Sequence, residues 1–162
     1  MDAGLEAYMA HLRLLNAYCH ALDTCDWALM RTLFTENAVF AARTMQGRTP
    51  GPDDIRLEGR EKLVGHLEKV WARLSATHHM ISNHVVEASA DGDSARGSCY
   101  IRAYHAGAGE RAHLFEESLG RFDFTSIRED GAWRIRTWDE NIMIMLGTPE
   151  VFAHPPGELT TG

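Results

Sequence analysis

The sequence is poor in cysteine and has neither a basic cluster nor a long apolar run. Its three cysteines, Cys19, Cys25 and Cys99, fit no C-x-x-C pattern, which suggests neither a disulfide framework nor a cysteine zinc site and fits a reducing compartment. Lys and Arg number 16 against 23 Asp and Glu, for a formal net charge of −7, so we expect neither nucleic acid nor an anionic membrane as a partner. Apolar runs such as residues 142–146 are far shorter than the roughly 20 residues of a spanning helix, and the N-terminus has no signal-peptide pattern. We therefore expect a cytoplasmic protein.

The motifs of several large enzyme classes are also missing. No glycine-rich phosphate loop or nucleotide fingerprint occurs, so no organic cofactor is predicted, and no nucleophile elbow points to acyl transfer. Histidine, by contrast, is plentiful, with nine residues in the chain. His79 and His105 could converge on a metal across paired strands. The sequence contains no H-E-x-x-H motif, however, and it does not place a carboxylate that could serve as a third ligand. We therefore predict no metal site.

What the chain does contain is typical of a globular domain. It has 162 residues, of which 44% are apolar and 24% are charged, values close to the average for folded domains. We find no repeat, no low-complexity tract and no linker. Residues 1–162 are therefore expected to form a single domain.

Apolar spacing predicts three helices in the first half of the chain. Between residues 5 and 22, apolar side chains recur at intervals of four and three residues, which indicates a long helix with one buried face that ends near Asp23. Asp26 is a suitable N-cap for a short second helix. Residues 41–58 hold several Gly and Pro, which indicates a loop, and the helical spacing returns over residues 59–74.

After these helices, the pattern changes to that of strands. Alternating and β-branched segments separated by glycine-containing turns predict four strands, over residues 77–89, 95–105, 113–127 and 133–145. Gly120 interrupts the third of them, where a bulge or bend is expected. Helices followed by an antiparallel meander indicate an α+β fold in which a curved sheet packs on helices and leaves a pocket.

The order of elements, together with several short motifs, resembles the SnoaL-like branch of the NTF2-like superfamily. The motifs are L-D-T-C-D-W at 22–27, G-R-E at 59–61, T-H-H-M-I-S-N at 77–83, G-D-S-A at 92–95 and G-A-W-R-I at 131–135. The resemblance covers nearly the whole chain. It implies an NTF2-like cone, with the N-terminal helices packed in the concave face of a curved antiparallel sheet. This fold hosts enzymes and plain binding domains alike.

Within that superfamily, the chain resembles scytalone dehydratase, bile-acid 7α-dehydratase and hexachlorocyclohexane dehydrochlorinase. The resemblance implies a histidine base on the first long strand, His79, oriented by an aspartate at the end of the first helix, Asp23. The dehydrochlorinase has a lysine where this chain has Tyr18. This difference shifts the expected reaction from dehydrochlorination to dehydration or isomerisation, in which a tyrosine hydroxyl can polarise an oxygen.

The chemistry of the two side chains supports the same pair. A neutral imidazole titrates near the working pH, so it can take a proton from carbon and return it to a leaving hydroxide. An aspartate that accepts a hydrogen bond from one ring nitrogen fixes the tautomer and stabilises the imidazolium. We expect the two side chains in hydrogen-bond contact at the base of the largest pocket. The alternatives are that Asp23 only ends its helix and that His79 is a core histidine.

Three further residues are candidates for substrate binding. Asn83 lies on the His79 face by strand alternation, Arg136 could meet an oxyanion or leaving group, and Tyr18 precedes Asp23 on the first helix. A turn cap, a surface arginine and a core tyrosine are their respective structural alternatives. The sequence thus predicts a cofactor-independent lyase or isomerase, dehydratase-like, that acts on a small hydrophobic, cyclic molecule. The alternative is a non-catalytic ligand-binding or assembly domain.

The last predicted strand also suggests self-association. Residues 142–146 are apolar on both faces of the strand, and such a segment is expected to be covered by a partner subunit or by the tail. We therefore expect a homodimer or a homotrimer.

Overall fold

The structure is a computed structural model that describes residues 3–44 and 55–153. The helices are α1 (Ala3–Thr24), α2 (Trp27–Leu33), α3 (Arg60–Trp71) and the short 3-10 helices η1 (Gly109–Arg111) and η2 (Pro149–Phe152). The strands are β1 (Phe34–Thr44), β2 (Ile55–Glu58), β3 (Leu74–Ala88), β4 (Ser94–Gly107), β5 (Phe115–Glu129) and β6 (Ala132–Gly147). The three predicted α-helices and the four predicted long strands are confirmed.

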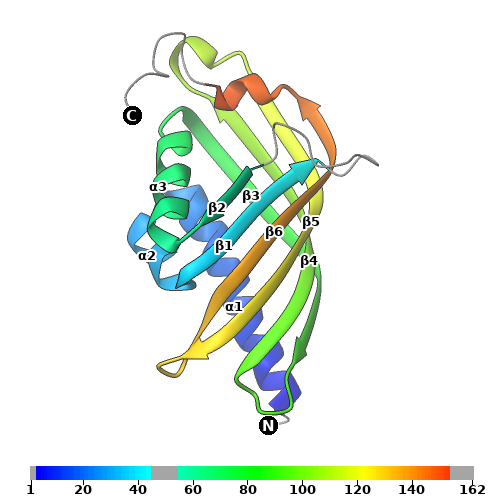
Figure 1. Cartoon of the computed structure of the whole chain (residues 1–162). Coiled ribbons are helices and arrows are strands. Elements are labelled where there is room, and N and C mark those ends of the chain that lie inside the picture. The colour runs from blue at the N-terminus through cyan, green and yellow to red at the C-terminus, as the bar shows by residue number, and fades with distance from the viewer. Residues whose placement is uncertain (1–2, 45–54, 154–162) are drawn as a thin grey trace.

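The strands form one sheet in the order β2-β1-β6-β5-β4-β3. All neighbours are antiparallel except β1 and β6, which run parallel, so the expected antiparallel sheet is in fact mixed. The long connection through β2, α3 and the meander carries the chain back beside β1, and a parallel pair needs such a crossover. Figure 1 shows β1 and β6 side by side in the middle of the sheet.

The predicted loop over residues 41–58 is wrong at both ends. β1 continues to Thr44, and β2 pairs with residues 39–42 of β1 in an antiparallel ladder. β2 has only four residues, too few for the alternation of apolar and charged residues over Ile55–Glu58 to stand out beside the Gly and Pro that precede it. The centre of the predicted loop, residues 45–54, lies outside the described residues.

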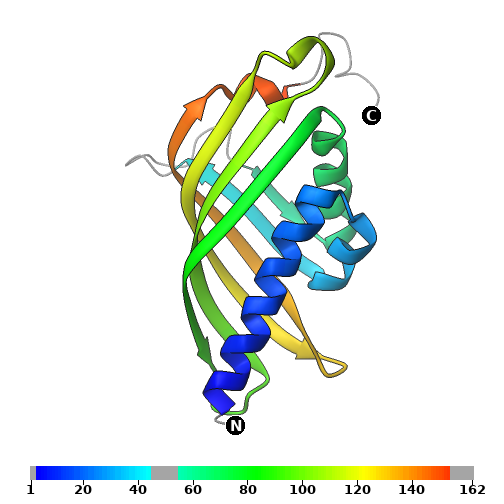
Figure 2. The ribbon, with the colours of Figure 1, turned by 180° about the vertical axis from the view of Figure 1, so that it is seen from behind.

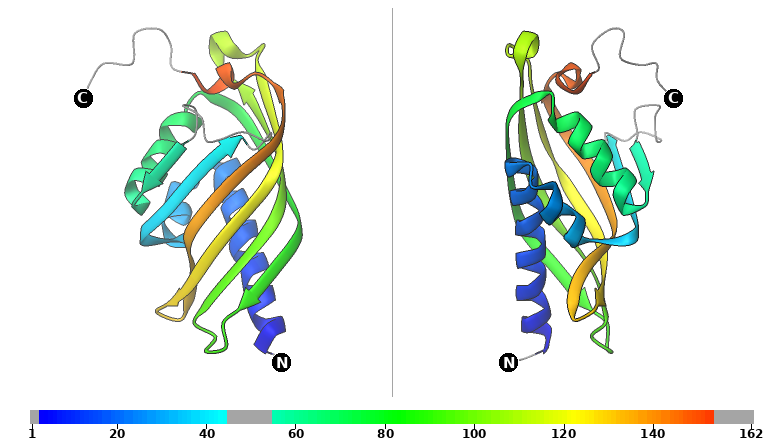
Figure 3. Two further views of the ribbon diagram at one scale, coloured as in Figure 1. Left: turned by 45° about the vertical axis from the view of Figure 1, so that its right-hand side comes forward. Right: turned by 90° about the vertical axis from the view of Figure 1, so that its left-hand side faces the viewer.

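The helices cover one face of the curved sheet, as Figures 2 and 3 show. In β5, inward residues are buried and alternate with more exposed ones. The expected irregularity at Gly120 is present as a register shift, but the extra residue, Met143, is in the neighbouring strand β6. A Cβ at this glycine would collide with the carbonyl oxygen of Asn141. The core between helices and sheet is made by the largest fully buried side chains, among them Trp138, Tyr18, Phe34, Leu15, Leu22 and Met30.

None of the helices in the described ranges combines the length and the apolar character needed to cross a lipid bilayer.

Candidate active site

Asp23 lies in the last turn of α1, and the end of that helix is well defined. The Asp26 amide donates to the Ala21 carbonyl at 2.9 Å and the Cys25 amide to the Leu22 carbonyl at 3.3 Å, while Cys25 has a φ of 55°. These are the features of a Schellman C-cap. Asp26 then caps α2, as predicted, by accepting from the Leu29 amide at 2.9 Å. A carboxylate at the negative end of a helix dipole is unfavourable, so Asp23 must be held charged by other groups.

Those groups come from β3, one of the two edge strands of the sheet. The carboxylate Oδ1 accepts from the His79 ring Nδ1 at 2.6 Å and from the Thr77 hydroxyl at 2.8 Å. Its Oδ2 accepts from the His79 backbone amide at 3.0 Å. An edge strand leaves such an amide without a strand partner, and the end of α1 supplies its acceptor. Asp23 thereby fixes both the backbone and the ring of His79.

Burial and hydrogen bonding set the charges of this pair. Partial burial acts to raise the pKa of Asp23, but the hydrogen bonds from His79 and Thr77 outweigh it and lower the pKa to about 2. Burial lowers the pKa of His79, despite the opposing hydrogen bond to Asp23. At neutral pH the pair is therefore a carboxylate beside a neutral imidazole with its proton on Nδ1. No residue in the described ranges hydrogen-bonds to Nε2, which keeps its lone pair.

A second histidine–carboxylate pair lies next to the first. His105 Nδ1 and Glu116 Oε2, on neighbouring strands β4 and β5, are 2.7 Å apart, and Ser118 donates to the other oxygen of Glu116. The His105 ring centroid is 5.3 Å from that of His79 and 4.9 Å from that of Phe152 in η2. The two histidines thus converge across paired strands, as the sequence allowed. In the part of the chain that the structure describes, no group of three or more His, Cys, Asp or Glu could hold a metal ion.

Tyr18 is 1% exposed, and its hydroxyl donates to Glu140 Oε1 at 3.1 Å. Trp138 Nε1 donates to the same oxygen at 3.3 Å. Glu140 is opposite Phe122 in the β5–β6 ladder, on the inner face. Burial raises the pKa of Glu140 to about 7. Tyr18 is therefore a core residue whose polar end binds a carboxyl group that titrates near neutrality.

A bulge in β6 explains why Glu140 faces inward. Ser126 pairs with Ile135 and Thr125 pairs with Thr137, so Arg136 is an extra residue in β6. Beyond this bulge the alternation changes phase, and Trp138 joins Ile135 on the buried face. The inward position of Glu140 could not be predicted, because the alternation of residues along the sequence carries no sign of such a shift.

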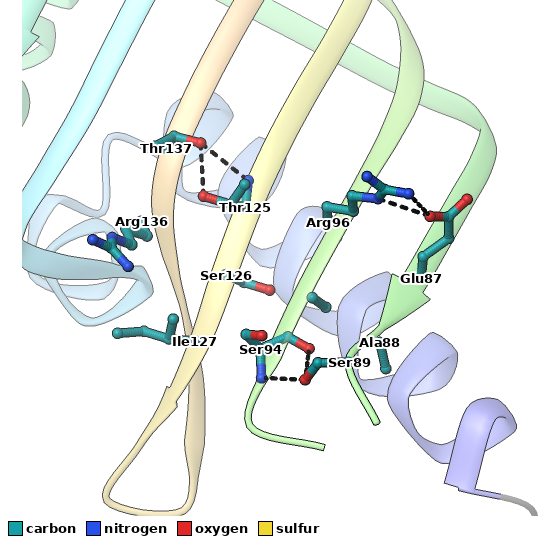
Figure 4. Close-up of a pocket in the computed structure, with 11 residues that line it drawn as sticks. Glu87, Ala88, Ser89, Ser94, Arg96, Thr125, Ser126, Ile127, Arg136 and Thr137 are labelled. Carbon is teal, nitrogen blue, oxygen red and sulfur yellow. Dashed lines mark hydrogen bonds and ion pairs between the residues drawn. The ribbon is translucent and has the colours of Figure 1, made fainter. Parts of the chain in front are cut away.

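The structure does not bring Asn83 and Arg136 to the pair. Asn83 is exposed and has a φ of 54°, at a register shift between Ser82 and Val85 of β3. Arg136 is exposed and lines a hollow of about 690 Å³ near the ends of β3–β6 (Figure 4). Neither Asp23 nor His79 lines this hollow or a smaller one of about 330 Å³ beside it. We expected the Asp23–His79 pair at the base of the largest pocket, but the pair lines neither of these two hollows.

The fold and the site together define the class of protein: an α+β cone whose inner face carries an aspartate–histidine pair. The model of the SnoaL-like domain family matches residues 3–139, and the chain belongs to that family. A search of curated protein sequences finds no match.

Solved structures share the fold. A proposed scytalone dehydratase from Novosphingobium aromaticivorans has a TM-score of 0.77 at 20% identity, over 98% of this chain and 99% of that chain. A hexachlorocyclohexane dehydrochlorinase from Novosphingobium barchaimii has a TM-score of 0.71 at 14% identity, over 95% and 98%. The β subunit of a proposed aromatic-ring-hydroxylating dioxygenase from N. aromaticivorans has a TM-score of 0.72 at 13% identity, over 88% and 93%. These structures therefore share the fold of this chain, and their names include a dehydratase, a dehydrochlorinase and an oxygenase subunit.

Proposed function

We propose that this protein is a cofactor-independent lyase or isomerase that removes a proton from a carbon acid. The observation that carries the proposal is the Asp23–His79 pair, with its ring hydrogen bond of 2.6 Å and its second contact to the His79 backbone. His79 Nε2 takes the proton, and the resulting imidazolium keeps its Nδ1–H bond to the Asp23 carboxylate. Burial strengthens that stabilisation because the charges are less screened than in water.

The surroundings of the pair favour a small hydrophobic substrate. Trp71 lies beside both histidines, with ring centroids 6.1 Å from His79 and 5.6 Å from His105. Phe152 contacts His105 from the C-terminal side. Aromatic side chains around a few polar groups are typical of sites for apolar ligands. We therefore propose a small, cyclic, apolar carbonyl compound as the substrate class.

Hydrogen exchange on carbon tests the base directly. A cyclic ketone such as cyclohexanone is incubated with the protein in deuterated water, and loss of the α-proton signal is followed by NMR. We expect His79→Ala to slow the exchange by about 10²–10⁴-fold, the usual contribution of a general base. His78→Ala is the matched control, because His78 is exposed on the neighbouring position of β3, and we expect it to keep the rate.

The same experiment distinguishes a binding domain from an enzyme. Full exchange activity in His79→Ala contradicts the proposal. Saturable binding of the ketone without any exchange, in the unmodified protein and in both variants, favours the non-catalytic ligand-binding or assembly domain.

A further inference from the structure

Glu140 is a carboxyl group in the interior that the proposed proton abstraction does not use. We propose that Glu140 is the general acid of the site and protonates the oxygen atom that leaves the substrate. The inference rests on the proposed function, since an acid of this kind acts together with the base His79. It is carried by the hydrogen bonds of Glu140, by the groups around it and by the charges of the interior.

The two hydrogen bonds to Glu140 decide which oxygen can carry an acidic proton. Tyr18 and Trp138 both donate to Oε1, so a proton on that oxygen would face two donors. The proton must therefore reside on Oε2, for which the described residues supply no acceptor. Glu140 remains partly exposed, whereas Tyr18 and Trp138 are each 1% exposed. Oε2 is thus the carboxyl oxygen that the hydrogen bonds of the described residues leave available to a ligand.

The same two donors prepare the carboxylate that remains after proton transfer. Negative charge that develops on Glu140 is shared with Oε1, where the Tyr18 hydroxyl and the Trp138 indole are already in place. Donors that are oriented before the reaction need no reorganisation during it. Neither donor can itself be the acid, because burial raises the pKa of Tyr18 far above its usual range and an indole does not titrate.

The titratable neighbours of Glu140 come from three elements. Tyr18 and Cys19 face it from α1, His105 from β4 and Glu116 from β5. Burial raises the pKa of Glu140 to about 7, with Glu116 adding to the increase and His105 opposing it. The group is therefore substantially protonated at the pH at which His79 is neutral. The environment of Glu140 raises its pKa, and the environment of His79 lowers the pKa of that ring. Such a pair can supply the acid and the base of one elimination.

The charges of the interior indicate the kind of leaving group. The hydrogen bonds of Asp23, Glu116 and Glu140 come from imidazole, hydroxyl, phenol, indole and backbone amide groups, without a lysine or arginine among these partners. The nearby Arg73 guanidinium donates to the Phe152 carbonyl instead. A halide leaves as an anion and is helped by a cation, whereas hydroxide is a poor leaving group unless it is protonated. A neutral carboxylic acid supplies that proton, so the site is suited to the loss of an oxygen leaving group from an uncharged substrate.

The elimination balances with these two residues. His79 Nε2 takes the proton from carbon, and the electron pair of that C–H bond forms the new C=C bond. The C–O bond breaks with its pair on oxygen, which takes the proton from Glu140 Oε2 and leaves as water. The imidazolium and the carboxylate then return to their starting states by proton exchange through solvent.

Two substrates that differ only in the leaving group test the role of Glu140. The probes are a β-hydroxycyclohexanone, which loses water, and the matching β-(nitrophenoxy)cyclohexanone, whose phenolate needs no proton to leave. We expect Glu140→Gln to slow the first reaction by about 10²–10⁴-fold and to leave the second within a few-fold. Gln retains an acceptor oxygen for Tyr18 and Trp138, so the variant should fold. Glu117→Gln is the control, because Glu117 pairs with Arg102 on the exterior of the sheet.

The outcomes separate this inference from the proposed function. Equal loss on both probes, or no loss on either, overturns the role of Glu140. Full activity of His79→Ala on both probes overturns the base instead. A readout without turnover is the infrared band of a protonated carboxyl group at pH 6. We expect that band in the unmodified protein and in Glu117→Gln but not in Glu140→Gln, and its absence from the unmodified protein also overturns the inference.

Discussion

Replacing Asp23 with asparagine changes the donors and acceptors of the pair with almost no change in shape. The carboxylate receives hydrogen bonds from the Thr77 hydroxyl, the His79 ring and the His79 amide. An amide side chain has one acceptor oxygen, so either orientation places its NH₂ against a donor. When NH₂ faces the ring, Nδ1 must become the acceptor and the proton moves to Nε2. The nitrogen that should accept the substrate proton is then occupied.

The structure also gives the size of the stability effect. The pKa of Asp23 is about 2 in the folded protein against an ordinary 3.8, and one unit corresponds to about 1.4 kcal/mol. The carboxylate therefore contributes about 2 kcal/mol to the free energy of unfolding. Because the folded pKa is depressed, this contribution is present above the ordinary value and is lost as the pH falls through about 2. Asp23→Asn should thus be less stable at pH 7, with a difference that shrinks in acid.

Three measurements check this reasoning. Urea denaturation at pH 7 and at low pH gives the free energies of unfolding, ¹⁵N NMR of the His79 ring gives the tautomer, and the exchange assay gives the rate. We expect a loss of about 10²–10⁴ in rate together with the change of tautomer. Asp26→Asn is the control, because asparagine caps a helix as well as aspartate does. A variant at Asp23 that keeps both the rate and the Nδ1 tautomer would refute the argument.

Three further results are expected. The pKa of Glu140 is raised to about 7 from an ordinary 4.5, so the folded state favours the protonated carboxyl group and the protein loses stability as the pH rises between these values. Denaturation should therefore show Glu140→Gln to be about 3 kcal/mol more stable than the unmodified protein at pH 8 and similar to it at pH 4. Gly97→Ala should lower the free energy of unfolding by about 1–3 kcal/mol, because a Cβ there meets the Val85 carbonyl and the Phe124 ring; an unchanged midpoint contradicts this. Light scattering at micromolar concentration should give a homodimer or a homotrimer, and Tyr100→Glu should lower the mass, whereas a monomer contradicts the prediction. The exposed apolar side chains that motivate it lie on strands β3, β4 and β6: Met80, Val85, Tyr100, Tyr104, Met143, Ile144 and Leu146.

Much of the fold could be predicted because apolar residues recur at regular intervals along the helices and strands. The stripe of α1, the Asp26 cap and the strands of the meander are local patterns, and each is present in the structure. The residues Asp23 and His79 were placed by their resemblance to a family pattern, and the structure brings them together although they are 56 residues apart in the sequence.

The remaining features depend on interactions that local patterns do not encode. The parallel pairing of β1 with β6 joins distant segments, and β2 is too short to show a period. Bulges were the main obstacle at the site, since the extra residue Arg136 brings Glu140 inward and the irregularity after Ser82 leaves Asn83 exposed. Register shifts of this kind are set by the packing of neighbouring strands.

The position of β6 between β1 and β5 has a consequence for biosynthesis. β1 is made early but hydrogen-bonds to a strand that ends at Gly147, as Figure 1 shows. A nascent chain therefore cannot complete the middle of its sheet until β6, up to Gly147, has left the ribosome. During that interval the apolar stripe of α1 has no finished sheet to cover it, so truncated or slowly translated chains should depend on chaperones or aggregate.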